Sequence, residues 1–479
     1  MTQRFGKNVV IYAAADFFAR GTQLFALPIY TALLSVEQFG QLSLLTVSAS
    51  LLAMLINLGV NNAVQRYYFE SEKNGISHAK IVSTGLIQLI LSGILFCSLF
   101  ILTFIIVDPG NVAIFNIDPK LFLLAFLYII PDQIAQYIQD VLRLQFKPVT
   151  FFYIAIVRSF LGVLVGLWLL MGWSMGVEGV LIGTLVGSVL AVPLGIFAIR
   201  KDLIFEFDMP IARDLLKFGS PFVLVGASYW IFQSMDRWML ANLSGMEEVG
   251  IFTVANKFAV IISFATFAFN RAWAPHAFYL HANDGNYKNT ITKVFSLWFF
   301  LISLTSLAIS LFGGEILVIF TPKEYWDAAP ILSIMCAAMA LDGTTIFTLL
   351  GISLEKRTFL MNYGTWIAAL VNIALNFLLL PSYGALGAAL AALSAYGALT
   401  GYFLWMSQRL HPLPLEWRKL SYALALVVCA ALAPFALSIF GSGIFAHSIK
   451  IGFLGLAIAV GVGLGIINSG IVRQLTQKN

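Results

Sequence analysis

The chain is a succession of long apolar runs separated by short polar segments. A helix that crosses a bilayer needs about 20 predominantly apolar residues, and fourteen runs meet that requirement. The alternation over about ten residues that is typical of a membrane β-barrel is missing, so each run is predicted to be an α-helix. The predicted spans are residues 8–34, 39–66, 79–107, 119–146, 148–172, 176–199, 214–242, 247–280, 290–313, 325–352, 358–380, 384–408, 419–440 and 447–470.

The composition also indicates a membrane protein. Of the 479 residues, 60% are hydrophobic and 11% are charged, whereas soluble proteins average about 25% charged residues. The first apolar run is long and has no cleavage site of small residues, so it is predicted to be the first span and not a cleavable signal. The sequence therefore predicts an all-α polytopic membrane protein with about 14 transmembrane helices.

The distribution of Lys and Arg predicts the orientation. Nineteen of the 28 basic residues lie at the termini or in every second loop, and three lie in the opposite loops. By the positive-inside rule, both termini are predicted to be cytoplasmic. The six remaining basic residues fall inside predicted spans: Arg20, Arg66, Arg158, Arg237, Lys257 and Arg271.

Three short motifs recur at nearly one offset. They are residues 35–40 with 245–250, residues 4–6 with 217–219, and residues 176–179 with 384–387, at offsets of 210, 213 and 208. Such echoes indicate an internal duplication, and units of six spans place both copies in the same orientation. The predicted parts are a six-helix lobe (1–199), a cytoplasmic amphipathic linker (200–213), a second six-helix lobe parallel to the first (214–409), and two extra C-terminal helices with a tail (410–479).

Charged residues inside the spans are the main chemical signal. In the first span Asp16 and Arg20 lie one turn apart, within a polar stripe that cannot face lipid. In the fourth span Asp132, Gln136 and Asp140 also repeat at four-residue spacing, and Pro131 predicts a kink beside them.

Amides accompany these charges. The second span carries Asn57 and Asn61. The eighth carries Asn256, directly before Lys257, and Asn270, directly before Arg271. Together with Gln136, they are predicted to line a polar cavity, although interhelical hydrogen bonding is the commoner role of such residues. Gly397 and Gly401 form a small-residue motif in the twelfth span, for which close helix packing is expected.

The charge balance of the spans suggests the cargo. With Asp140 assigned to the cytoplasmic end of its span, six basic residues against four acidic ones (Asp16, Asp132, Asp236 and Asp342) leave a positive interior, so the cavity is predicted to hold an anion. All six basic residues are candidates for binding it. Asp16, Asp132 and Asp342 are candidates either for ion coupling or for ion pairing, and pairing would make some of the cations structural. No catalytic constellation, metal site or cofactor site is predicted.

The segment from Asn372 to Ala392, Asn-Ile-Ala-Leu-Asn-Phe-Leu-Leu-Leu-Pro-Ser-Tyr-Gly-Ala-Leu-Gly-Ala-Ala-Leu-Ala-Ala, carries a family resemblance. With the duplication and the stretch Ser234-Met-Asp-Arg237, it resembles the multidrug/oligosaccharidyl-lipid/polysaccharide exporter superfamily. Within that superfamily the chain is most similar to the polysaccharide-biosynthesis branch, which includes the O-antigen flippases. The resemblance covers the whole chain and specifies the fold better than the cargo.

The resemblance implies a flippase and no enzymatic activity. Its polysaccharide members move undecaprenyl-pyrophosphate-linked oligosaccharides from the cytoplasmic to the outer leaflet through a cavity that opens alternately to each side. For this chain it implies the bacterial inner membrane, a role in lipopolysaccharide or other polysaccharide biosynthesis, and lipid-linked oligosaccharide and membrane lipid as partners. Polysaccharide polymerase and chain-length proteins are further implied partners, and nucleic acid is not one.

Two other functions stay open at this point. A cation-coupled small-molecule exporter of the same fold would have a more acidic or apolar cavity, against which the basic excess counts. A membrane-embedded polysaccharide polymerase would need a large external loop with paired catalytic residues, and the sequence shows neither.

Overall fold

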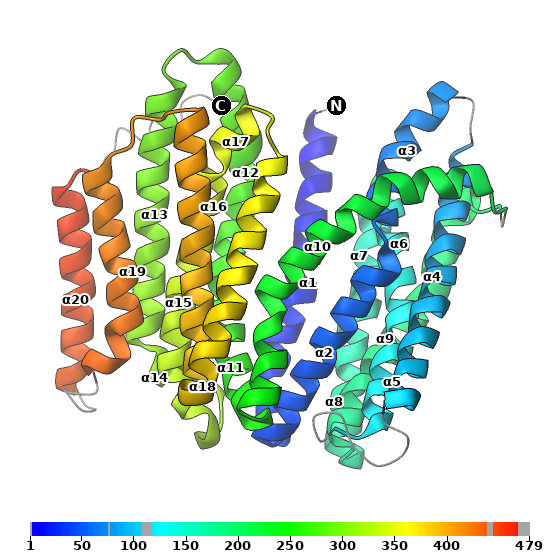
Figure 1. Cartoon of the computed structure of the whole chain (residues 1–479), viewed down its shortest axis with the longest axis horizontal. Coiled ribbons are helices and arrows are strands. Elements are labelled where there is room, and N and C mark those ends of the chain that lie inside the picture. Colours follow the sequence, from blue (N-terminus) through cyan, green and yellow to red (C-terminus); the bar gives the residue numbers. More distant parts are fainter. Residues whose placement is uncertain (1, 75–76, 108–116, 205, 438–443, 468–479) are drawn as a thin grey trace. The chain divides into compact units, whose positions relative to one another are not determined.

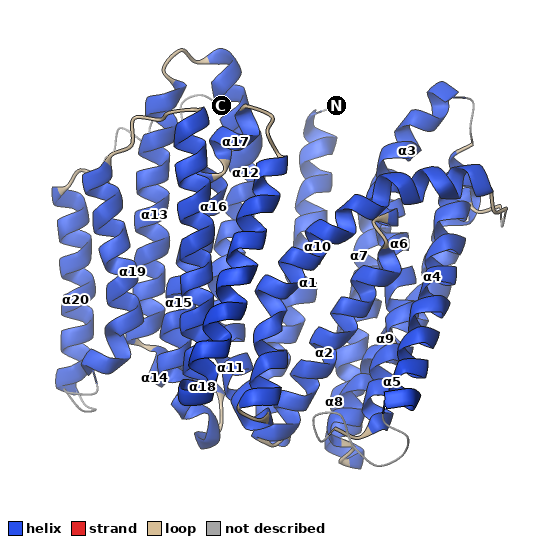
Figure 2. Ribbon diagram, in the orientation of Figure 1, coloured by secondary structure: helices blue, strands red, loops and turns tan. Residues whose placement is uncertain are grey.

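The computed structural model describes residues 2–74, 77–107, 117–204, 206–437 and 444–467. Some side chains near the N-terminus, among them those of Asp16 and Arg20, are outside the described set, although their backbone belongs to the first helix. The chain divides into two compact units, residues 1–230 and residues 231–479. Within the described ranges every regular element is a helix and none is a strand (Figure 2).

The first unit contains α1 to α9 and most of α10 (Figure 1). Its elements are α1 (Thr2–Leu33), α2 (Val36–Asn57), α3 (Val60–Asn74), α4 (His78–Val107), α5 (Pro119–Leu127), α6 (Ile129–Leu144), α7 (Pro148–Ile156), the π-helical turn η2 (Val157–Leu161), α8 (Gly162–Trp173), α9 (Gly176–Ile199), the 3₁₀ turn η3 (Arg200–Asp202) and α10 (Met209–Leu243).

The second unit continues from the end of α10. Its elements are α11 (Met246–Ala259), α12 (Ile261–Asn283), α13 (Tyr287–Leu311), α14 (Gly313–Phe320), the 3₁₀ segment η4 (Lys323–Ala328), α15 (Ala329–Asp342), α16 (Thr345–Thr348), α17 (Leu350–Leu354), α18 (Phe359–Leu410), α19 (Trp417–Leu437) and α20 (Ile444–Gly463). The buried core between α13, α19 and α20 includes Phe300, Leu307, Leu426 and Ala457.

The all-α polytopic prediction is confirmed. Twelve helical stretches among the described residues are long and apolar enough to cross a membrane. One of them, α18, has 52 residues and would measure about 78 Å at 1.5 Å per residue, against a hydrocarbon core of about 30 Å. It is broken at Gly384 (φ 50°, ψ −132°), and Gly364 before the break abuts Phe403 after it. The two halves therefore run antiparallel, and with α1 they complete the fourteen predicted spans.

Two of the predicted spans are interrupted, one beside a proline and one at two residues with positive φ values. The fourth span breaks between α5 and α6 at Tyr128, because Pro131 has no N–H to donate to the carbonyl of Leu127. The second span breaks between α2 and α3, where Leu58 and Gly59 both have positive φ values. A Cβ on Gly59 would lie 2.2 Å from the carbonyl oxygen of Gly219, so α10 crosses this corner at backbone contact.

Small residues set the closest helix packing in unit 1. A Cβ on Gly183 of α9 would lie 2.3 Å from the backbone nitrogen of Gly166 on α8, and one on Gly187 would lie 2.5 Å from the carbonyl oxygen of Arg158. The expectation for span 12 is wrong: a Cβ on Gly401 would meet nothing within 4 Å, and one on Gly397 would meet only a Leu341 methyl at 4.0 Å. The close seam is between α8 and α9 instead.

The segment 200–213 lies against α4. It begins as η3, continues without regular structure and enters α10 at Met209. The N–H of Ile204 donates to the Ser83 hydroxyl (3.0 Å), and that of Asp208 donates to Thr84 (3.2 Å). These two bonds fix the start of α10 to the beginning of α4.

Candidate functional site

The central polar feature of unit 1 is an ion pair between Arg158 and Asp132. The guanidinium donates to both carboxylate oxygens, from Nε at 2.7 Å and from Nη2 at 2.8 Å. Its Nη1 also donates to the side-chain oxygens of Gln136 (2.6 Å) and Gln139 (2.8 Å). Four of the five N–H groups of the guanidinium are therefore used by protein acceptors.

The π-helical turn η2 carries Arg158 to this position. Arg158 is about 15 Å along the span from Pro148, at 1.5 Å per residue, and so lies at the depth of the membrane centre. Single π-turns inside α-helices are frequent at functional sites. The carbonyl oxygen of Arg158 faces Gly187 of α9, and Ser188 next to it donates to Asp132 (3.2 Å). The glycine seam thus brings α9 close enough to take part in the network.

The polar face of α6 continues beyond the ion pair. Asp140, two turns after Asp132, accepts a hydrogen bond from the Asn61 amide at 2.7 Å, and Arg143 lies 3.4 Å from its other oxygen. Asp132, Gln136 and Asp140 thus share one helical face, as predicted, and every one of them has a polar partner. Each basic residue of this face is paired with an acid, so the network is close to electroneutral.

The polar centre of unit 2 is organised differently. Asp236 of α10 is 3% exposed and accepts a 2.6 Å hydrogen bond from the Asn376 amide, which also donates to Asn372 (3.1 Å). The adjacent Arg237 is also buried. It donates to the main-chain oxygen of Gln233 (3.0 Å), and its guanidinium carbon lies 5.5 Å from the centre of the Phe252 ring.

Lys257 is a cation without an acid. It lies on α11 about 16 Å along the helix from Met246, at 1.5 Å per residue, which again corresponds to the middle of a bilayer. In the part of the chain that the structure describes, no hydrogen-bond acceptor and no carboxylate within 4 Å engages its ammonium group. The charged group that acts on the Lys257 ammonium is the guanidinium of Arg237, which is also positive. Unit 2 therefore holds positive charge that its own acids do not neutralise.

The remaining cations are exposed and lie on aromatic rings. The guanidinium carbon of Arg66 on α3 is 4.6 Å from the centre of the Phe218 ring, and that of Arg271 on α12 is 4.5 Å from the Phe267 ring. Both side chains are exposed at the surface of their unit.

The other predicted site residues fall into two groups. Asn61 and Gln136 are engaged in the unit 1 network. Partly exposed side chains without a hydrogen bond to the described protein belong to Asn57, Asn256, Asn270 and Asp342. Asp16 and Arg20 share the same face of α1, and their side chains are outside the described residues.

Sequence reasoning missed several members of these networks. Gln139 and Ser188 bind the ion pair. Ser188 has no charged residue four positions away, whereas Gln139 lies seven residues after Asp132 and four before Arg143, a spacing that could have identified it. Asn372 and Asn376 carried a usable signal, because amides four residues apart in an apolar span indicate an interhelical partner. That partner is Asp236. No cluster of three or more His, Cys, Asp or Glu residues able to hold a metal ion occurs among the described residues.

Membrane-spanning helices with charged and amide networks at mid-depth define a polytopic membrane protein of the transporter class. Residues 5–281 match the family model described as "Polysaccharide biosynthesis protein". Since this match covers more than half of the chain, the chain belongs to the polysaccharide biosynthesis protein family. The resemblance stated from the sequence is thereby confirmed.

Individual proteins are similar to the chain in sequence or in fold. The "Probable low-salt glycan biosynthesis flippase Agl15" of Haloferax volcanii is 22% identical over 395 residues, which is 81% of this chain and 80% of the relative. A structure of "Lipid II flippase MurJ, inward closed conformation" matches with a TM-score of 0.70 at 17% identity, over 95% of this chain and 98% of that one. An inward-facing multidrug resistance MATE family transporter of the MOP superfamily matches with a TM-score of 0.62 at 16% identity, over 81% and 94%.

Proposed function

We propose that this protein is a flippase for a lipid-linked glycan. Its cargo is an undecaprenyl-pyrophosphate-linked oligosaccharide, which moves from the cytoplasmic to the outer leaflet by alternating access. The chain belongs to a family of polysaccharide biosynthesis proteins. Two proteins that are similar to this chain, one from Haloferax volcanii and one of the MurJ type, are named as flippases. These names support the class of activity, and the charges of the spans support the class of headgroup.

The observation that carries the proposal is the unpaired Lys257. An ionised ammonium group in a membrane interior is costly unless an opposite charge accompanies it, so such a residue usually marks a substrate or ion pathway. No acid of the described chain is close enough to pair with it, and Arg237 raises the positive potential around it. A pyrophosphate supplies the missing negative charge, because it offers several strong acceptors to Lys and Arg donors.

The proposal assigns different roles to the cations. Lys257 and Arg237 hold the pyrophosphate, and the exposed Arg66 and Arg271 capture it. Arg20 is a further candidate on α1. Arg158 donates four hydrogen bonds to the protein, so its role as a direct ligand requires a conformation in which Asp132 releases it. The amides Asn256 and Asn270, which neighbour two of the cations, suit sugar hydroxyls.

Asp342 is the candidate for ion coupling in unit 2. Its carboxylate has no hydrogen bond or ion pair with the described protein, so a proton or cation can associate with it without breaking an internal contact. Asp342→Asn is expected to change the pH dependence of flipping while leaving cargo binding intact. Equal pH profiles for Asp342→Asn and the wild type would remove Asp342 from the coupling mechanism.

Transport into vesicles tests the function directly. The purified protein is reconstituted with a fluorescent undecaprenyl-pyrophosphate oligosaccharide, and the fraction of cargo in each leaflet is followed with a membrane-impermeant quencher. The protein is expected to move this cargo, and Lys257→Ala is expected to stop the movement. Lys293→Ala is the matched control, because Lys293 is an exposed lysine of α13 in the same unit.

The outcome also separates the alternatives. Movement of small cationic drugs without movement of the glycan lipid would instead support the cation-coupled exporter, whose fold is similar. Complementation of surface-polysaccharide synthesis in a flippase-deficient strain gives the same comparison in cells. Interaction with a polymerase or a chain-length protein is a further proposal, for which co-purification from those cells is the measurement.

A further inference from the structure

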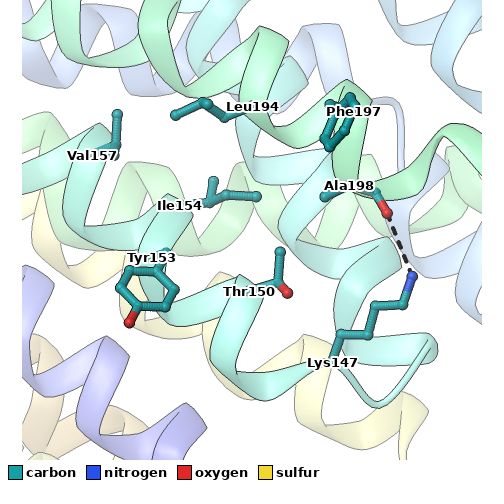
Figure 3. Close-up of a pocket in the computed structure, with 8 residues that line it drawn as sticks. All are labelled: Lys147, Thr150, Tyr153, Ile154, Val157, Leu194, Phe197 and Ala198. Atoms are coloured by element: carbon teal, nitrogen blue, oxygen red, sulfur yellow. Dashed lines mark hydrogen bonds between the residues drawn. The ribbon is translucent and has the colours of Figure 1, made fainter.

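A groove lies between α7 and α9 at one end of unit 1 (Figure 3). Its volume is about 420 Å³, within the range of about 300–1,000 Å³ that is usual for small-molecule sites. The side chains of Tyr153, Leu194 and Phe197 on its walls are more than half exposed. In a helix that crosses a membrane, exposed apolar walls face lipid chains, so the groove opens toward the bilayer.

Two cations lie at one end of this groove. Lys147, the residue before α7, reaches across to the main-chain oxygen of Ala198 near the end of α9 (3.4 Å). The guanidinium carbon of Arg200, which follows α9, lies 4.0 Å from the centre of the Phe197 ring. Positively charged residues thus flank the groove from both helices, at the end of the spans that the distribution of basic residues predicts to be cytoplasmic.

Further groups at this end suit an anion. The N–H groups of Val149 and Thr150 belong to the first turn of α7, where they have no intrahelical acceptor and the helix dipole is positive. The hydroxyl group of Thr150 makes no hydrogen bond with the described protein. The lining contains no acidic residue, and nearby Asp202 already accepts a hydrogen bond from Gln145.

We propose that this groove binds an anionic phospholipid. One acyl chain lies along Ile154 and Leu194, and the phosphate is placed between Lys147 and Arg200. The apolar walls exclude a free phosphate as the preferred occupant, and the paired cations favour an anionic over a zwitterionic headgroup. Basic pockets between membrane helices on the cytoplasmic side are known to select anionic lipids in this way.

The bound lipid would touch the element that positions the Arg158 ion pair. Val157 lines the groove and is also the first residue of η2, whose next residue is Arg158. An acyl chain against Val157 would therefore contact the π-turn next to the residue that binds Asp132. This site is separate from the proposed glycan-binding cations of unit 2 and does not depend on the flippase proposal.

Lipid binding to the full-length protein tests the site. The protein is purified in detergent, stripped of lipid and titrated with fluorescent phosphatidylglycerol, with phosphatidylcholine of the same chains and with glycerol phosphate. Phosphatidylglycerol is expected to bind most tightly. Lys147→Gln and Arg200→Gln should each weaken it about fivefold, since a basic residue near an anionic surface contributes about 1 kcal/mol. Lys201→Gln is the matched control, because Lys201 is exposed next to Arg200 and, unlike Arg200, does not lie over the ring of the groove residue Phe197.

A second variant keeps the test informative if the charge variants misfold. Leu194→Trp places a larger side chain in the groove and keeps both cations, so it should weaken phosphatidylglycerol binding without changing the net charge. Equal binding of phosphatidylglycerol and phosphatidylcholine by the wild type would overturn the proposal. So would binding of glycerol phosphate as tight as that of the lipid, or full binding by Leu194→Trp.

Discussion

The two units differ in the polar partners that they give to a basic residue in the middle of a span. Arg158 of unit 1 is clamped by a bidentate carboxylate and two glutamine side chains, at 2.6–2.8 Å. Lys257 of unit 2 lies about as far along its own helix, and no acceptor of the described chain engages it. Both residues look alike in the sequence, as a cation within an apolar run.

This difference separates a structural charge from an available one. Arg158 and Asp132 neutralise each other, so the protein has already compensated the cost of burying them. Lys257 keeps its charge for a partner that the protein does not contain. The number of cations in the spans therefore overstates the number that can bind cargo, and the local partners decide which ones are available.

The largest expected effect is that of removing Arg158. Arg158→Ala leaves the Asp132 carboxylate, whose side chain is 17% exposed, without its partner. Breaking a fully buried ion pair costs about 3–5 kcal/mol of folding free energy, which is the upper limit for this partly buried pair. We expect a large fall in the amount of folded protein, which fluorescence-detected size-exclusion chromatography measures. The double variant Asp132→Leu, Arg158→Met should recover the folded protein, because neither charge remains. A fully stable Arg158→Ala protein would show that the pair is not structural.

The corresponding variant of the acid site in unit 2 should have a smaller effect. Asn376→Ala removes the 2.6 Å hydrogen bond to Asp236, and a hydrogen bond to a charged group contributes about 1.5–3 kcal/mol. The midpoint of thermal unfolding of the purified protein is expected to fall. Asn362→Ala serves as the control, because Asn362 lies on the same helix away from Asp236. An unchanged midpoint for Asn376→Ala would mean that Asp236 is satisfied in another way.

The glycine seam beside Arg158 gives an intermediate effect. Gly183→Ala would place a Cβ 2.3 Å from the backbone nitrogen of Gly166, so α8 and α9 must move apart. Overpacking of this kind costs about 1–3 kcal/mol, and thermal unfolding measures it. At Gly401 the same change meets nothing within 4 Å, so Gly401→Ala should be neutral or stabilising. Equal stability of the two variants would contradict the packing assigned to the seam.

The smallest effects on stability are expected at the exposed cations. Each of Arg66 and Arg271 lies over one aromatic ring, a contact that contributes about 0.5–1 kcal/mol at exposed sites. Arg66→Ala and Arg271→Ala should therefore fold normally and raise the cargo concentration needed for half-maximal flipping. Arg66→Lys should retain part of the capture, because it keeps the charge. A loss of folded protein in either alanine variant would assign these residues a structural role.

The sequence predicted the fold well because hydrophobic length dominates it. The fourteen apolar runs correspond to α1 and to the twelve candidate stretches, of which α18 counts as two, and Pro131 located the break in the fourth. Two details of the fold were not predicted from the sequence. The break at Leu58 and Gly59 depends on the close approach of α10, and the seam at Gly166 and Gly183 depends on which helices become neighbours. Both are tertiary contacts that no local pattern records.

The polar face of the fourth span was predictable from the sequence, and the pairing of its residues was not. Four-residue spacing placed Asp132, Gln136 and Asp140 on one face correctly, because helical periodicity is a local property. It could not tell that Arg158, which is on another helix, would bind that face. Nor could it tell that Lys257 would find no acid. The distinction between structural and available cations needs the positions of the neighbouring helices.

Binding of the lipid pyrophosphate to Lys257 variants tests the central distinction most directly. The affinity of the purified protein for undecaprenyl pyrophosphate is compared with that for undecaprenol, which has the same chain without the charge. Lys257→Ala should weaken pyrophosphate binding about tenfold or more, since a charge-assisted hydrogen bond contributes about 1.5–3 kcal/mol. Lys257→Arg should bind nearly as well as the wild type, undecaprenol binding should not change, and folding should be unaffected. Wild-type affinity for the pyrophosphate in a well-folded Lys257→Ala protein would contradict the account.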